Sequence, residues 1–295
     1  MAEFEIKDGV AIIPEGIDKI EDNAFSGCKE LTSVEIPTSV KSVGSRAFEN
    51  CTGLTSVELP DSVAKLGTFT FENCTSLTSA KLSKSIKSLW GTFSGCTELT
   101  DVVLPESLAF ICDFSFRSCA KLASVEIPSS VTEIGKGAFY GCKSLTSVNI
   151  PSSVKELGYC AFWGCAGLTN VEIPVMPAIG ESAFAECSGL TSVVIPEGVT
   201  EIKDFAFSGC SGLTNVVIPA GVTAIGRSAF DKCGSLTSVT LPAGIKKIGE
   251  RAFNRCENLT NISVPVKKAD YYKNRLPENL HQYIVEREPE KKAKK

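Results

Sequence analysis

Residues 128–150 read PSSVTEIGKGAFYGCKSLTSVNI, and the alternation near the end of this stretch decides the fold. In the last six residues, LTSVNI, the apolar Val148 and Ile150 alternate with polar side chains. A period of two is expected of a β-strand that has one buried face and one solvated face. A proline follows, and it ends the strand because it has no amide hydrogen to donate to a sheet.

Two further segments complete the 23-residue stretch, which we treat as one structural unit. Residues 131–134, VTEI, are rich in β-branched side chains and predict a second, shorter extended segment. Gly135 follows as a turn residue. The pairs Ala138-Phe139 and Gly141-Cys142 predict a tight helical or 3₁₀ turn before the next strand.

The unit recurs along most of the chain. Copies begin at Pro14, Pro37, Pro60, Ser83, Pro105, Pro128, Pro151, Pro174, Pro196, Pro219 and Pro242, and the last one ends at Pro265. A single unit cannot bury its own leucine, valine, isoleucine and phenylalanine, whereas stacked units can. The sequence therefore predicts a β-rich repeat solenoid of eleven repeats over residues 14–265, with parallel strands joined by short 3₁₀ or helical turns.

One phenylalanine recurs in every repeat and predicts a buried stack of aromatic rings. Its copies are Phe25, Phe48, Phe71, Phe93, Phe116, Phe139, Phe162, Phe184, Phe207, Phe230 and Phe253. A threonine recurs at the start of each strand, with Ala123 as the one break. An exposed threonine column is also seen on ice-binding faces, but we expect these hydroxyls to bond the backbone at the strand entrance.

Eleven of the thirteen cysteines form a further column at steps of 22 or 23 residues, and no C-x-x-C pair occurs. They are Cys28, Cys51, Cys74, Cys96, Cys119, Cys142, Cys165, Cys187, Cys210, Cys233 and Cys256. We expect buried, reduced thiols, because parallel Cβ vectors in neighbouring repeats do not converge into a disulfide. Cys112 and Cys160 lie outside the column and are expected at the surface as the two reactive thiols.

The two ends of the chain predict caps. Residues 1–13 form the N-terminal cap, and Phe4, Ile6, Val10 and Ile12 around Asp8-Gly9 predict a hairpin. Residues 266–286 form a helical C-terminal cap of two short helical segments, the second beginning at Pro277. Tyr272, Leu276, Leu280 and Ile284 are expected to close the core, and residues 287–295 are expected to be a disordered basic tail.

The strand motif L-x-x-V-x-I-P and the turn motif I-G-x-x-A-F-x-x-C, repeated every 23 residues, resemble the BspA-like leucine-rich repeat family from Ile13 to Pro265. The resemblance implies a right-handed leucine-rich-repeat superhelix with parallel strands on its concave side. It also implies a bacterial surface protein or adhesin, since family members typically bind host or bacterial proteins.

Composition narrows the function further. The chain has 295 residues, 43% of them apolar, and a net charge of −4, which does not favour a nucleic-acid partner. No run of apolar residues is long enough to cross a membrane. His281 is the only histidine, and no catalytic or phosphate-binding motif occurs, so we expect no enzyme activity, no metal and no cofactor. An enzyme with an undetected site is the remaining alternative.

The start of the chain, MAEFEIKDGV, has neither a basic start nor an apolar core and so carries no secretory signal. We therefore expect a cytoplasmic protein. The alternative is a secreted or cell-surface protein, if an export signal precedes these residues.

The departures from the repeat indicate where a partner would bind. The outward strand residues change from repeat to repeat and predict a binding strip on the concave face: Glu35, Glu58, Lys81, Val103, Glu126, Asn149, Glu172, Val194 and Val217. Aromatic residues occupy turn slots that are polar or small elsewhere and predict an aromatic patch: Phe69, Trp90, Phe114, Tyr140, Tyr159 and Trp163. For Phe69, Trp90 and Phe114, we favour the simpler explanation that they fill the gap left by the short repeat at residues 83–104. We expect a monomeric scaffold that binds one protein through either surface.

Overall fold

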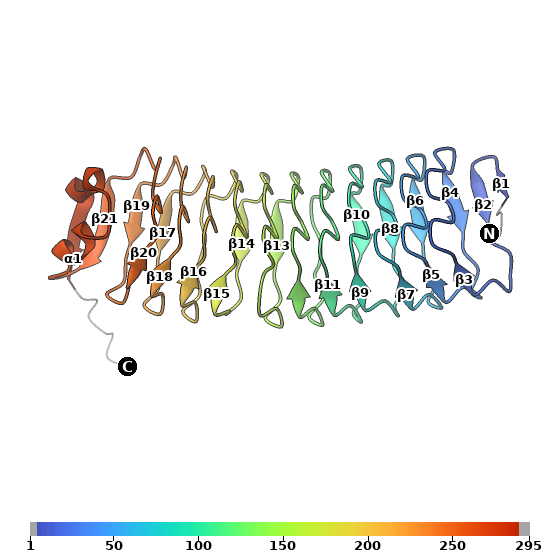
Figure 1. Cartoon of the computed structure of the whole chain (residues 1–295), viewed down its shortest axis with the longest axis horizontal. Coiled ribbons are helices and arrows are strands. Elements are labelled where there is room, and N and C mark those ends of the chain that lie inside the picture. The colour runs from blue at the N-terminus through green and yellow to red at the C-terminus, as the bar shows by residue number, and fades with distance from the viewer. Residues whose placement is uncertain (1–4, 289–295) are drawn as a thin grey trace.

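The computed structural model describes residues 5–288, and within them the chain is a parallel-strand solenoid of about twelve turns. Figure 1 shows the turns following one another along a single long axis, with the two chain ends at opposite ends of the rod. The core runs the length of the rod, because each turn buries the same apolar positions as its neighbours. The predicted repeat solenoid is confirmed.

The longer strand of each turn forms one side of the rod, which we call the strand face. These strands are β2 (Val10–Ile12), β4 (Ser33–Glu35), β6 (Ser56–Glu58), β8 (Ser79–Lys81), β10 (Asp101–Val103), β13 (Ser147–Asn149), β14 (Asn170–Glu172), β17 (Asn215–Val217), β19 (Ser238–Thr240), β21 (Asn261–Pro265) and β22 (Ile284–Arg287). Those that pair do so in parallel and in register, so that Val57 lies beside Ala80 and Ala80 beside Val102.

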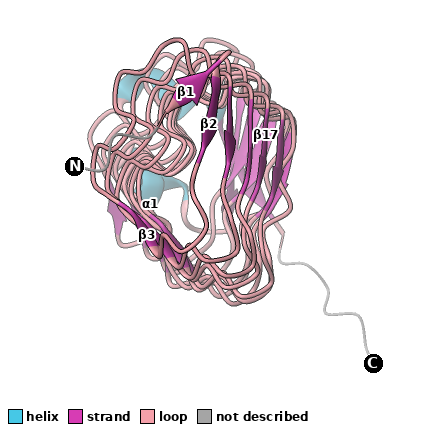
Figure 2. Cartoon of the chain, turned by 90° about the vertical axis from the view of Figure 1, so that its right-hand side faces the viewer, coloured by secondary structure: helices cyan, strands magenta, loops and turns pink. Residues whose placement is uncertain are grey.

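A second set of strands, each of two residues, lines another side of the rod, and loop turns close the remaining side (Figure 2). They are β3 (Lys19–Ile20), β5 (Ser42–Val43), β7 (Lys65–Leu66), β9 (Ser88–Leu89), β11 (Phe110–Ile111), β12 (Glu133–Ile134), β15 (Ala178–Ile179), β16 (Glu201–Ile202), β18 (Ala224–Ile225) and β20 (Lys247–Ile248). These are the short extended segments that the sequence predicts.

The turn side is also hydrogen-bonded from one repeat to the next. The amide of Phe25 donates to the carbonyl of Ala47, and the amide of Gly27 donates to that of Glu49, both at 2.7 Å. The amides that alternate with these bond locally: Ser26 donates to Asn23, and Cys28 donates to Phe25. Alternate amides therefore hold the turn closed and join it to its neighbour, so few backbone groups are left unpaired.

This turn is not the 3₁₀ or helical segment expected from the sequence, because two residues in each unit have positive φ. The first set is Asn23, Arg46, Phe69, Gly91, Phe114, Gly137, Cys160, Ser182, Phe205, Ser228 and Arg251; the second is Gly27, Asn50, Asn73, Gly95, Ser118, Gly141, Gly164, Glu186, Gly209, Lys232 and Arg255. Left-handed residues break a right-handed helix and let the chain reverse direction within a few residues.

Replacing a non-glycine residue at one of these positions tests the backbone argument. Lys232 has a φ of 60° and an exposed side chain, so Lys232→Gly removes left-handed strain without removing a core contact. We expect the free energy of unfolding to rise by about 1 kcal/mol in urea titrations. The control is Lys143→Gly, at an exposed position without a positive φ, which should lower that free energy by about 0.5–1 kcal/mol. Equal changes in the free energy of unfolding for the two variants would contradict the assignment of Lys232 to a strained left-handed position.

The phenylalanine column forms an unbroken stack through the core. Successive rings lie 5.0–5.7 Å apart and nearly parallel from Phe25 to Phe253. Rings at this separation are offset, which is the favourable arrangement for stacked aromatic groups. The ring stack predicted from the sequence is present.

Each column cysteine from Cys51 onward donates its thiol hydrogen to the backbone carbonyl of the phenylalanine in the preceding turn. The Sγ–O distances are 3.0–3.3 Å. All thirteen cysteines are free thiols. Burial raises the pKa of most column thiols, to about 12 for Cys142, so they stay protonated at neutral pH. Ten of the eleven column thiols are buried as expected, and Cys28 is half-buried.

The prediction that Cys112 and Cys160 are surface thiols is wrong. Cys112 is 4% exposed, and burial raises its pKa to about 12. It stands where other turns have a glycine packed against the previous turn; a Cβ at Gly135, for example, would lie 2.7 Å from a backbone nitrogen. Cys160 is 8% exposed, and burial raises its pKa as well. Cys28 is the most exposed of the thirteen, because no complete turn precedes it.

Thiol labelling tests this corrected assignment. At pH 8 we expect one fast-reacting thiol in the native protein, at Cys28, and thirteen after denaturation. Cys28→Ser should abolish the fast phase, while Cys112→Ser and Cys160→Ser should leave it intact. A fast phase that survives Cys28→Ser would show that another thiol opens to solvent.

The N-terminal cap is a hairpin of β1 (Ile6–Lys7) and β2, joined by Asp8 and Gly9, both with positive φ. An Asp-Gly pair is favoured in such a turn. Strand β2 then pairs in parallel with β4 and starts the strand face. The predicted hairpin is present, although Phe4 lies outside the described residues.

The C-terminal cap contains α1 (Ala269–Lys273), the 3₁₀ helix η1 (Glu278–Tyr283) and then strand β22. Tyr272, Leu276 and Leu280 are buried against the last repeat, while Ile284 is half-buried. The sequence interpretation missed β22 and began the tail at residue 287. Arg287 is instead part of the cap, because its guanidinium donates to the carbonyls of Ser263 and Leu241. Residues 289–295 of the predicted tail lie outside the described part.

Candidate functional site

The strand face places all nine of its predicted binding residues in solvent. They are Glu35, Glu58, Lys81, Val103, Glu126, Asn149, Glu172, Val194 and Val217. Val194 is 78% and Val217 is 61% exposed on neighbouring turns. These side chains stand one per turn along the whole rod, so they form a strip and do not converge.

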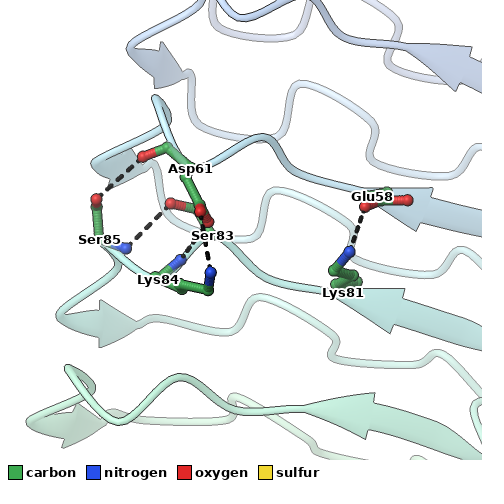
Figure 3. A network of polar contacts seen from close by, with 6 residues as sticks. All are labelled: Glu58, Asp61, Lys81, Ser83, Lys84 and Ser85. Carbon is green, nitrogen blue, oxygen red and sulfur yellow. Dashed lines mark hydrogen bonds and ion pairs between the residues drawn. The ribbon is translucent and has the colours of Figure 1, made fainter.

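Charged groups on this part of the rod are partly paired with each other. Lys81 forms an ion pair with Glu58 on the neighbouring strand (Figure 3). In the adjacent loop, Asp61 accepts a hydrogen bond from the backbone amide of Lys84, and this bond lowers the pKa of the Asp61 carboxyl. Such exposed pairs contribute little to the stability of the fold.

The strand face is interrupted between β10 and β13. Within the described residues, the backbone of residues 124–127 makes no hydrogen bond to either neighbouring strand. The interruption coincides with Ala123, the break in the threonine column. In most other turns the hydroxyl and the amide of the column threonine both donate to the carbonyl of its counterpart in the previous turn, as Thr78 does to Thr55. At Ala123 neither bond to Thr100 is made.

This interruption opens a groove of about 460 Å³ on the strand face. Val102 and Val125 lie at its base, and Asp101, Glu106 and Glu126 are among the residues that line it. The sequence signal for the groove is the single alanine in the threonine column.

Restoring the missing hydroxyl tests this cause. In Ala123→Thr the new side chain can donate to the carbonyl of Thr100, as its counterparts do. We expect slower hydrogen exchange at residues 124–127 and a gain of about 0.5–1 kcal/mol in the free energy of unfolding. Ala123→Val is the matched control, since it has the same branched shape without the hydroxyl. Equal protection in the two variants would mean that shape, not the hydrogen bond, closes the strand face.

Three phenylalanines occupy the first positive-φ column, and each is followed one turn later by a small residue. Phe69 precedes Gly91, Phe114 precedes Gly137, and Phe205 precedes Ser228. A Cβ on Gly91 would lie 2.3 Å from the Phe69 ring, and one on Gly137 would lie 3.0 Å from the Phe114 ring. The rings of Phe69 and Phe114 thus lean over the next turn, and only a glycine leaves room for them.

Around Gly137 the neighbouring columns carry large side chains, and a pocket of about 490 Å³ results. We call it the aromatic pocket. It is lined by Phe114, Arg117, Lys136, Gly137, Tyr140, Tyr159, Cys160 and Trp163, which come from three consecutive repeats. Tyr159 is 49% exposed, while the other three aromatic side chains are half-buried. The volume is within the range of small-ligand and hot-spot pockets.

The rings and cations of the aromatic pocket are mutually ordered. Tyr140 and Trp163 stack at 4.5 Å with an interplanar angle of 11°. The guanidinium of Arg117 lies 5.7 Å from the centre of the Phe114 ring and 5.9 Å from that of Tyr140. The Lys136 ammonium lies 5.7 Å from the Phe114 ring and 5.8 Å from that of Tyr159. Each cation is thus shared by two rings, and cation–π attraction favours this arrangement.

The predicted aromatic patch is therefore divided. Phe114 joins Tyr140, Tyr159 and Trp163, whereas Phe69 and Trp90 lie outside the aromatic pocket. Trp90 is 48% exposed and stands alone. Sequence reasoning missed Arg117, Lys136 and Gly137. The signal that could have found them is their position in the repeat, since they occupy the same columns as the aromatic residues of the neighbouring turns.

Within residues 5–288, no helix is long and apolar enough to cross a membrane. The same residues contain no group of three or more histidine, cysteine, aspartate or glutamate side chains placed to hold a metal ion.

The fold defines a leucine-rich-repeat solenoid, and comparison with known families gives its type. A profile of the BspA-type leucine-rich repeat region, six copies long, matches residues 9–91, 90–176 and 177–276. These matches span nearly the whole chain, and the chain therefore belongs to the BspA-type leucine-rich repeat family. The resemblance seen in the sequence motifs is confirmed.

Solved structures agree on the fold. A leucine-rich repeat protein from Bacteroides ovatus is 27% identical, with a TM-score of 0.69 over 95% of this chain and 84% of that one. The pneumococcal vaccine antigen PcpA is 20% identical, with a TM-score of 0.60 over 94% of this chain and 77% of that one. A leucine-rich repeat protein from Eubacterium ventriosum is 21% identical, with a TM-score of 0.56 over 84% and 82%. No curated protein matches this chain.

Proposed function

We propose that this chain is a non-enzymatic protein-interaction scaffold whose partner binds at the aromatic pocket. The observation that carries the proposal is the convergence of Phe114, Tyr140, Tyr159 and Trp163 at slots that are small or polar in most other turns. Tryptophan, tyrosine and arginine are the residues most enriched in interface hot spots. The leucine-rich-repeat fold supports the same class of function, because solenoids present extended binding surfaces.

The aromatic pocket is favoured over the strand face for a physical reason. A hot spot needs several large side chains that can be desolvated together. The strand-face residues stand one per turn, and Glu58 and Lys81 already neutralise each other. The groove at residues 124–127 is the strongest feature of that face, but its lining is mainly acidic and polar.

Alanine substitution in the aromatic pocket tests the proposal. The intact rod is used as bait in an affinity pull-down, and binding of the captured protein is then measured with purified components. We expect Tyr159→Ala/Trp163→Ala to weaken this binding by at least about 30-fold, because hot-spot truncations cost 2 kcal/mol or more. Trp90→Ala is the matched control, since Trp90 is an exposed aromatic residue on the turn side but outside the aromatic pocket.

Two results would contradict the proposal. One is unchanged binding in Tyr159→Ala/Trp163→Ala, with a loss in Val194→Asp/Val217→Asp, which would move the site to the strand face. The other is an equal loss in Trp90→Ala, which would indicate a general effect on the rod. The adhesin role and the location of the protein stay predictions, as does its monomeric state.

A further inference from the structure

The two cations of the aromatic pocket form no close ion pair, although Arg117 acts electrostatically on Glu72 two turns earlier in its column. Within the described residues, neither Arg117 nor Lys136 forms an ion pair or a side-chain hydrogen bond. A cation at an equivalent slot behaves differently: Arg227 lies 4.9 Å from the Phe205 ring and also pairs with Asp204 at 3.9 Å. The carboxylate equivalent to Asp204 is Asp113, and both accept the backbone amide of the residue one turn later. Within the described residues, however, the Lys136 ammonium forms no ion pair with Asp113, whereas the Arg227 guanidinium pairs with Asp204.

No carboxylate lines the aromatic pocket. The acid one turn before Lys136 in its column is Asp113, whose Oδ1 accepts the backbone amide of Lys136 at 2.7 Å. The acid one turn after Tyr159 is Glu181, which is exposed and outside the pocket lining. The whole chain has a net charge of −4, so two cations that line one pocket without an ion pair are a local reversal of its charge.

The ring faces of Tyr140 and Phe114 are already in use. Arg117 comes from the turn before Tyr140, and Trp163 from the turn after it, so both faces of the Tyr140 ring are covered. The Phe114 ring contacts both cations and lies against Gly137. These two rings therefore offer a ligand their edges, and the edge of an aromatic ring is its positive part. Edges and cations together attract an anion.

Resting on the proposed function, we infer that the partner enters the aromatic pocket with an acidic peptide segment. One of its carboxylates lies between Arg117 and Lys136, and an adjacent apolar side chain contacts the edges of Tyr140 and Trp163. A carboxylate bound there would supply the ion pair that both cations lack. Nucleic acid and sugar ligands are disfavoured, because they bind by stacking on ring faces, and residues 1–265 carry a net charge of −8.

A defined peptide tests this inference on the full chain. The probe is a fluorescein-labelled hexapeptide of alternating glutamate and leucine, compared with the same peptide carrying glutamine in place of glutamate. In fluorescence anisotropy at 50 mM NaCl we expect the glutamate peptide to bind at least tenfold more tightly, and the difference to shrink at 0.5 M NaCl.

Arg117→Gln/Lys136→Gln should remove the preference for glutamate. Arg227→Gln is the matched control, since it removes a cation from an equivalent slot outside the aromatic pocket, and it should leave the preference intact. Equal binding of the two peptides to the wild type, or no binding of either, would overturn the inference. So would tighter binding of tri-galacturonic acid than of the glutamate peptide, which would assign the site to an acidic sugar.

The same variants separate this inference from the proposed function. If the captured protein is lost from Tyr159→Ala/Trp163→Ala but binds Arg117→Gln/Lys136→Gln unchanged, the aromatic pocket binds a protein that does not enter with an acid. If both variants bind the captured protein unchanged, the site itself is wrong. Circular dichroism and the thermal midpoint of each variant confirm that the rod remains folded.

Discussion

The constraint on which this structure depends is that every turn must stack in register on its neighbour. Backbone bonds between turns run along the strand face, the two-residue strands and the turn side, so each position meets its own counterpart above and below. A phenylalanine therefore meets a phenylalanine, and each column cysteine meets the carbonyl of the previous phenylalanine. Residue types that tolerate self-contact fill the core, and those that do not are excluded from it.

The same constraint explains why departures come in linked sets. Two of the three phenylalanines at positive-φ positions lean over a glycine in the next turn, Phe69 over Gly91 and Phe114 over Gly137. One missing hydroxyl at Ala123 accompanies the loss of backbone pairing over residues 124–127. In a stacked array, a single substitution changes the environment of the neighbouring turns, and binding surfaces arise where several such changes coincide.

Much of the candidate site could be predicted from the sequence, but its composition could not. Tyr140, Tyr159 and Trp163 stood out because the repeat defines what a normal turn contains. Phe114 was explained as filler for a short repeat, yet its ring forms a wall of the aromatic pocket. Arg117 and Lys136 looked like ordinary surface charges, because their lack of ion pairs is a property of three-dimensional neighbours. Cys112 was misplaced for a similar reason: its slot is narrow, and slot width depends on the turn before it.

The sequence by itself determined the architecture: the period, the parallel strands, the ring stack, the buried thiol column and the existence of caps. It could do so because each of these follows from a local pattern that is repeated many times. A pattern that arose by chance would not recur in every repeat. The tertiary structure decided where neighbouring strands do not pair. It also decided which of the non-consensus side chains lie next to each other. The groove at residues 124–127, the aromatic pocket and the strand that ends the rod at Arg287 depend on contacts between turns, and such contacts have no signature within one repeat.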